Sequence, residues 1–165
     1  MKRIYIVLFV LISTFTFAQE DRTSFVISGG TQYLDNFFVD FGFSIIKPLA
    51  GNKELDIKVS LDLRTENDGE SVKPEFNIPV YFDINFLFPI GEKLTYLVGT
   101  GITPTLRPLG DESIFLIGPN AKMGFRYKIH PSMSLLLEAT QSLLIGPPNW
   151  MYSATQIIFG INFFI

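Results

Sequence analysis

The chain has 165 residues, a length that suits one domain, with 13 Lys and Arg residues against 16 Asp and Glu residues. This balance offers no basic patch for a nucleic-acid partner, and the absence of Cys excludes disulfides and a cysteine-linked lipid anchor. Charged residues make up 18% of the chain and Phe alone occurs 17 times, whereas soluble domains are roughly 25% charged.

The first segment has the layout of a secretory signal peptide. Lys2 and Arg3 give it a positive start, and a mostly apolar run follows and ends at Ala18, after which the chain turns polar. The apolar run is short for a helix that spans a membrane, which needs about 20 residues. We therefore expect export with cleavage after Ala18, so that residues 1–18 form the signal peptide and residues 19–165 form one domain.

The rest of the chain alternates apolar and polar residues with a period of two. Eight such segments follow one another, at residues 23–33, 37–46, 54–65, 76–88, 94–106, 114–128, 134–144 and 152–165. Compact turns begin at Lys47, Pro89 and Ile129, and they alternate with connections that include polar loops at 66–75 and 107–113. This order predicts an all-β fold, an eight-stranded antiparallel up-and-down β-barrel with both termini at one end.

The clearest segment runs from Glu54 to Thr65. Up to Leu63 its odd positions are Leu, Ile or Val, and its even positions are charged or Ser. Such a strand has one apolar and one charged face. The run exceeds the usual strand of about 5–6 residues and suits a tilted strand that crosses a membrane, which needs about 9–11.

Alternation alone leaves open which face of the barrel points outward. In a soluble lipocalin-like carrier the apolar face would surround a ligand, and in a transmembrane barrel it would face lipid. The apolar face is rich in Phe, which would overfill a small interior, and the polar face carries few charges for a surface in water. We therefore predict a transmembrane β-barrel.

The signal peptide, the eight alternating strands and the terminal Phe159-Gly-Ile-Asn-Phe-Phe-Ile165 resemble small bacterial outer-membrane β-barrels of the OmpX/OmpA type. Such barrels usually end in Phe, whereas this chain ends in Ile165. The resemblance implies a monomer in the outer membrane of a Gram-negative cell envelope, in contact with outer-membrane lipid and the barrel assembly machinery.

The family includes structural and adhesion proteins as well as lipid-modifying enzymes, so the resemblance does not fix the function. We expect a non-enzymatic structural or surface-interaction role. The alternatives are a lipid-handling barrel, as a lipid A-modifying enzyme or a lateral conduit for small apolar molecules, and the soluble carrier.

In the membrane orientation, ten charged side chains are expected to face the lumen. They are Asp40, Asp56, Asp62, Asp83 and Glu138, with Lys58, Arg64, Lys122, Arg126 and Lys128. Buried charge is costly unless it is paired, so five acids and five bases predict a salt-bridge network that fills the lumen. The alternative is a narrow polar conduit or proton path.

Three prolines, Pro79, Pro104 and Pro119, lie inside predicted strands and toward one end of the barrel. Proline cannot donate a ladder hydrogen bond, so one hypothesis is a lateral gap at that end, and the other is strand ends that fray into loops. The same end gathers Trp150, Tyr152, Tyr33, Phe37 and Phe38, as an interfacial aromatic girdle would.

The one His, His130, lies near Ser132 and Glu138, which are the residue types that outer-membrane lipid A deacylases use. Catalysis would require the His and Ser side chains within hydrogen-bond reach, and Pro131 suits a tight turn better. We therefore predict no catalytic residues, no cofactor and no metal.

Overall fold

The computed structural model describes residues 23–67, 72–109 and 112–165. Ten strands make up the fold: β1 Ser24–Leu34, β2 Asn36–Leu49, β3 Lys53–Asn67, β4 Val72–Ile90, β5 Leu94–Ile102, β6 Thr105–Leu109, β7 Glu112–Leu116, β8 Pro119–His130, β9 Met133–Leu144 and β10 Tyr152–Phe164. Within these ranges no helix is long and apolar enough to cross a membrane.

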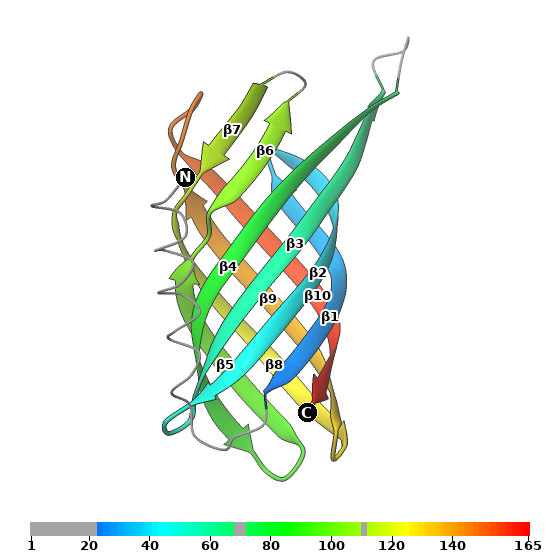
Figure 1. Cartoon of the computed structure of the whole chain (residues 1–165), viewed down its shortest axis with the longest axis vertical. Coiled ribbons are helices and arrows are strands. Elements are labelled where there is room, and N and C mark those ends of the chain that lie inside the picture. Colours follow the sequence, from blue (N-terminus) through cyan, green and yellow to red (C-terminus); the bar gives the residue numbers. More distant parts are fainter. Residues whose placement is uncertain (1–22, 68–71, 110–111) are drawn as a thin grey trace, which may run out of the picture.

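The strands form one closed antiparallel ring (Figure 1). β1 pairs with both β2 and β10, which joins the two ends of the chain's meander. β5 and β6 pair one after the other with β4, and β5 pairs with β8 while β6 pairs with β7. β5 and β6 thus form one wall of the barrel, and β7 and β8 form the next wall. The predicted eight-stranded antiparallel up-and-down β-barrel is therefore confirmed.

The two ends of the barrel differ. At the turn end, compact connections at residues 50–52, 91–93 and 131–132 join the strands, and Phe164 pairs with Ser24. At the opposite loop end, the β3–β4 ribbon and the β6–β7 hairpin extend the walls (Figure 1).

Two predicted loops are largely strand. Residues 66–75 were expected as a polar loop, but β3 continues to Asn67 and β4 begins at Val72, with Arg64 opposite Glu75. The Arg64 Nε–Glu75 Oε2 distance of 2.9 Å gives a cross-strand ion pair that favours the ribbon. In the expected loop 107–113, residues 107–109 and 112–113 likewise belong to the paired strands β6 and β7. The loop boundaries predicted from polar composition are therefore wrong.

The apolar face of each strand points outward and the polar face points inward. Phe41 and Phe159 on the outside are 57% and 54% exposed, whereas Lys58 and Asp83 on the inside are fully buried. A soluble carrier requires the opposite arrangement, so that alternative is wrong. The transmembrane orientation of the barrel follows from this inversion, because an apolar outer band is what lipid solvates.

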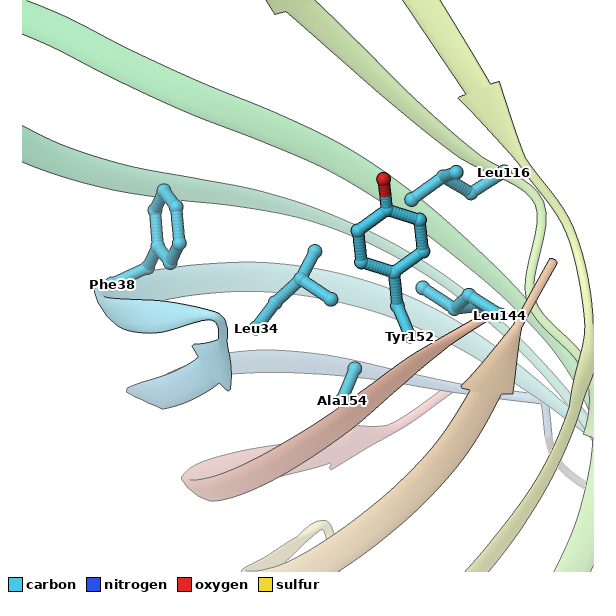
Figure 2. Close-up of a cluster of buried hydrophobic side chains, with 6 residues drawn as sticks. All are labelled: Leu34, Phe38, Leu116, Leu144, Tyr152 and Ala154. Carbon is cyan, nitrogen blue, oxygen red and sulfur yellow. The ribbon is translucent and has the colours of Figure 1, made fainter. Parts of the chain in front are cut away.

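Buried apolar side chains occupy the lumen toward each end. Val26, Ile46, Leu97 and Leu136 pack together toward the turn end. The loop-end cluster is larger, and Figure 2 shows its side chains extending from several strands into one interior space. Its members are Leu34, Phe38, Leu116, Leu144, Tyr152 and Ala154. Phe38 and Tyr152, expected in the aromatic girdle, thus point inward, while Tyr33, Phe37 and Trp150 are exposed.

Candidate functional site

A layer of buried charged side chains lies in the lumen, and Lys122 is the centre of its best-paired part. Lys122 Nζ lies 2.6 Å from Asp56 Oδ2, 2.8 Å from Asp83 Oδ2 and 3.9 Å from Glu138 Oε2. Asn120 Nδ2 donates to the other oxygen of Asp83 at 2.8 Å. The ammonium group therefore has three acidic partners, all of them buried.

Glycines on the inner face make room for this group. A Cβ atom on Gly99 would lie 2.9 Å from Lys122 Cγ, and one on Gly124 would lie 2.9 Å from Glu138 Cγ. Both glycines occupy inward positions beside the long side chains in the β5–β8 and β8–β9 ladders. On the inward face of β8, Gly124 lies between Lys122 and Arg126, so the glycines leave space for long side chains in the narrow lumen.

A second ion pair lies nearer the turn end. Arg126 donates from both terminal nitrogens to the two oxygens of Glu54, at 3.0 and 2.8 Å. Asn85 Nδ2 also donates to Glu54 at 3.0 Å. Arg126 borders an open cavity of about 320 Å³ at the turn end, which Leu87 and Lys128 also line. This bidentate pair therefore neutralises itself close to solvent.

Lys58 belongs to a chain of polar contacts across the lumen. Its Nζ donates to Gln156 Oε1, and Gln156 Nε2 donates to Asp40 Oδ2 at 2.8 Å. The ammonium also lies 4.2 Å from the ring centroid of Tyr81, a cation–π distance. Tyr81 in turn donates its hydroxyl hydrogen to Gln32 Oε1 at 3.0 Å. The Lys58 ammonium is thus linked to the Asp40 carboxylate through the Gln156 amide.

Asp62 is the exception in this layer. It lies directly opposite Asp40 in the β2–β3 ladder and opposite Asn77 in the β3–β4 ladder. Asp62 is fully buried, and neither of its carboxylate oxygens accepts a hydrogen bond from the described part of the chain. Asn77 is also fully buried, and both polar atoms of its side chain lack a partner there.

The expected balance of five acids and five bases does not describe the buried layer. Eight of the ten expected residues lie there, but Lys128 is exposed at the turn end because β8 passes the rim at that point. Arg64 is only partly buried, and it pairs with Glu75. Glu54, which was not among the ten, is buried. Among the described residues, six acids and three bases are therefore fully or nearly fully buried: Asp40, Glu54, Asp56, Asp62, Asp83 and Glu138, with Lys58, Lys122 and Arg126.

The inward parity of the strands could have located the residues that were missed. Glu54 shares the parity of Asp56 and Lys58, so parity alone places it inside. Asn77 and Gln156 also lie on inward parities, and a search for charges alone passes over neutral amides.

The three strand prolines lie in a wall whose hydrogen bonds continue past them. Pro79 is opposite Thr105 and Pro119 is opposite Ile102. The Pro104 carbonyl accepts the Val80 N–H at 2.8 Å, and the Gly118 carbonyl accepts the Thr103 N–H at 2.8 Å. The geometry therefore favours strand irregularity over a lateral gap at this wall.

A groove lies instead where β3 rises past the end of β2. Its volume is about 710 Å³. Pairing of β2 with β3 begins at Val39 and Leu63, so β3 beyond Leu63 pairs only with β4. The groove is lined by outward apolar residues and by two inward ones: Phe37, Val39, Phe41, Leu63 and Pro74, with Phe38 and Arg64.

His130 and Ser132 do come together, with Nδ1 and Oγ 2.8 Å apart on the exposed turn. Glu138 does not join them, because it is buried in the lumen beside Lys122. The geometry thus separates the third member of the deacylase-type set from the other two.

No family model matches the chain, and no curated protein matches its sequence. Its fold is similar to that of neisserial surface protein A, with a TM-score of 0.68 at 9% identity over 87% of this chain and 96% of that one. It is also similar to Ail, the attachment invasion locus protein of Yersinia pestis, with a TM-score of 0.57 at 12% identity over 87% and 97%. The N-terminal β-barrel domain of Pseudomonas aeruginosa OprF gives a TM-score of 0.55 at 16% identity over 85% and 97%. The chain has the fold of small outer-membrane β-barrel proteins.

Proposed function

We propose that this chain is an outer-membrane protein of the Gram-negative envelope with a structural or surface-interaction role, which it performs without transport through its lumen. The observation that carries the proposal is the filled interior: buried apolar clusters lie toward both ends, and buried charged side chains lie between them. An eight-stranded barrel has an interior just wide enough for such side chains. Contacts with a partner then belong to the rim and the outer wall.

The loop end is the part that we assign to the outside of the cell. The β3–β4 ribbon and the β6–β7 hairpin extend there, while the turn end has only compact connections. Longer extracellular loops and short periplasmic turns are typical of such barrels. An exposed rim with Trp150 and Phe37, 70% and 75% exposed, provides apolar contacts at that level.

Cell fractionation followed by gel migration with and without boiling tests the location. We expect a band in the outer-membrane fraction whose migration changes on boiling, because a folded barrel resists the detergent until it is heated. Mass measurement of the same band tests cleavage after Ala18. A single unshifted band in the soluble fraction would contradict the proposal.

Planar-bilayer recordings test the closed lumen. The purified protein should show no conductance near that of a porin, because the buried side chains of the two clusters and the charged layer fill the narrow interior. A loop-end variant such as Phe38→Ala, which shortens a member of one cluster, serves as a matched comparison. Porin-like conductance in the unmodified protein would refute the structural role of the filled lumen.

The groove at β2 and β3 supports a second candidate function, lipid handling. Its lining is predominantly apolar and faces the lipid side of the wall, so an acyl chain is the ligand class that it fits. Mass spectrometry of lipid A from cells with and without the gene tests the enzymatic form. Unchanged lipid A would exclude that form and leave acyl-chain binding to be measured on the purified barrel.

A further inference from the structure

The buried charge of the lumen is unequal from one region to the next. Arg126 and Glu54 neutralise each other, and Lys122 lies among Asp56, Asp83 and Glu138. Asp40 and Asp62 are left with indirect compensation, since Asp40 reaches Lys58 only through Gln156. The Asp40–Asp62 pair is therefore the part of the layer whose carboxylates have no cation in direct contact among the described residues.

The two carboxylates lie opposite each other on the inward face of the β2–β3 ladder. Like charges opposite one another in a ladder are destabilising, and burial away from water strengthens the repulsion. The pair is stable only if a positive species lies between or beside the two groups. A proton or a metal cation could fill that role.

The surrounding atoms favour a cation. Four oxygens here lack a hydrogen-bond donor: Asp40 Oδ1, Asp62 Oδ1, Asp62 Oδ2 and Asn77 Oδ1. One shared proton would supply a single hydrogen bond between the carboxylates, and even if Asn77 Nδ2 donated to Asp62, the amide oxygen of Asn77 would stay unsatisfied. A cation contacts several oxygens at once, and carboxylate and amide oxygens are the ligands that Ca²⁺ prefers.

The geometry points to a binding site for one divalent hard cation of the calcium class, held by Asp40, Asp62 and Asn77 at the loop-end side of the charged layer. Two carboxylates match its charge, and water completes the six to eight ligands that Ca²⁺ takes. The described ranges hold no group of three or more His, Cys, Asp or Glu residues placed for a metal; the proposed site has two carboxylates and takes the Asn77 amide oxygen as its third protein ligand.

Access to this site is available from the groove at β2 and β3. Phe38 and Arg64 line that groove, and each is the next inward residue after Asp40 or Asp62 toward the loop end. Arg64 lies 5.7 Å from the centroid of the Phe38 ring and pairs with Glu75. The Phe38 and Arg64 side chains are the one inward layer between the groove and the two carboxylates. In the proposed route, rotation of these two side chains would admit a hydrated ion.

Calcium titration calorimetry on the protein tests the inference. The protein is refolded in zwitterionic detergent without lipopolysaccharide and freed of metal with EDTA, so that lipid phosphates contribute no calcium binding. We expect one Ca²⁺ per chain, with weaker binding of Mg²⁺, which requires a more regular octahedral shell. Asp62→Asn and Asp40→Asn should each weaken calcium binding at least tenfold.

Asp83→Asn is the matched control, because it removes another fully buried carboxylate outside the site. It should leave calcium affinity within about threefold of the unmodified protein. The heat-unfolding midpoint gives a second readout: calcium should raise it in the unmodified protein and in Asp83→Asn, but not in Asp62→Asn. Asp62→Asn relieves repulsion, so it should fold and unfold at a higher temperature than the unmodified protein in EDTA.

Two results would overturn the site. One is an absence of calcium binding by the unmodified protein, or equal binding by Asp62→Asn. The other is an unfolding midpoint that depends on pH but not on calcium and loses that dependence in Asp62→Asn, which would identify a shared proton instead. Both results are independent of the fractionation and conductance experiments, so the surface role stands or falls separately.

Discussion

Buried charge in the lumen is paired directly at Lys122 but not at Asp62. Lys122 contacts two carboxylates at 2.6 and 2.8 Å and a third at 3.9 Å, and glycines in the neighbouring ladder positions give its stem room. Asp62 has a second carboxylate opposite it and an amide without partners on its other side. One region is organised by a protein cation in direct contact with its carboxylates, whereas in the other the nearest protein cation, Lys58, reaches Asp40 only through Gln156.

The difference arises from strand register rather than from composition. Lys122 reaches across the lumen to β3, β4 and β9, so one long side chain serves acids from three walls. Asp40, Asp62 and Asn77 come from adjacent strands and form a row along the ladder. The next inward residues are Phe38 on β2 and Ser60 and Arg64 on β3; Phe38 and Ser60 carry no charge, and Arg64 pairs with Glu75. A row of short acidic side chains cannot neutralise itself.

Replacing the organising cation gives the largest expected effect. Lys122→Met keeps much of the side-chain volume but leaves Asp56 and Asp83 without their cation, and breaking a buried pair costs about 3–5 kcal/mol. We expect the free energy of unfolding in detergent micelles to fall by that amount, measured by denaturant titration. Lys93→Met, at an exposed turn, is the control and should change little. A comparable loss of unfolding free energy in both variants would contradict the assignment of Lys122 as the cation that neutralises Asp56 and Asp83.

Arg126→Met tests whether water access moderates the cost. Glu54 loses both guanidinium contacts but keeps the hydrogen bond from Asn85, and the cavity beside Arg126 opens toward solvent. We therefore expect a smaller loss, about 1–3 kcal/mol, the range for a buried acceptor left without a partner. The same denaturant titration measures it. If Arg126→Met lowers the free energy of unfolding as much as Lys122→Met does, water has less access to Glu54 than the cavity beside Arg126 implies.

The sequence predicted the number of walls, their order and the orientation of both faces because alternation has a strict period of two. Phe41, Phe43 and Val39 must share one side of β2, whatever the tertiary packing. The same parity placed Asp40, Asp62 and Lys58 inside. These predictions required no knowledge of how the strands align with one another.

Prediction of the ion pairs, in contrast, requires knowledge of how the strands align with one another. Whether Arg64 meets Glu75 or a lumen acid depends on how far β3 and β4 continue past β2, and polar residues at 66–75 suggested that both had already ended. Lys128 has the inward parity, yet it lies beyond the rim. A charge count from parity therefore cannot identify an unpaired carboxylate, because burial depends on strand length and tilt as well as on the face.

The smallest expected effect concerns a polar group on the outer wall, where no charge has to be neutralised. Gln141 lies on the outer face of β9, where its Nε2 donates to Ser153 Oγ at 2.9 Å and its Oε1 accepts from Thr155 Oγ1 at 2.7 Å. The three side chains satisfy one another on an apolar surface. Hydrogen bonds of this kind in membranes average about 0.6 kcal/mol, so Gln141→Leu should lower the free energy of unfolding by only about that amount.

Denaturant titration of Gln141→Leu in micelles measures this loss, and Leu143→Gln is the reciprocal control on the same outer face of β9. Leu143→Gln should destabilise more, because Leu143 lies opposite Ser153 without the second hydroxyl that Thr155 provides to Gln141. A loss above about 2 kcal/mol for Gln141→Leu would show that the row has a further partner on the outer wall. A small loss would mean that neutral groups can be paired locally on this barrel, while its buried carboxylates require a cation drawn from another wall or from solution.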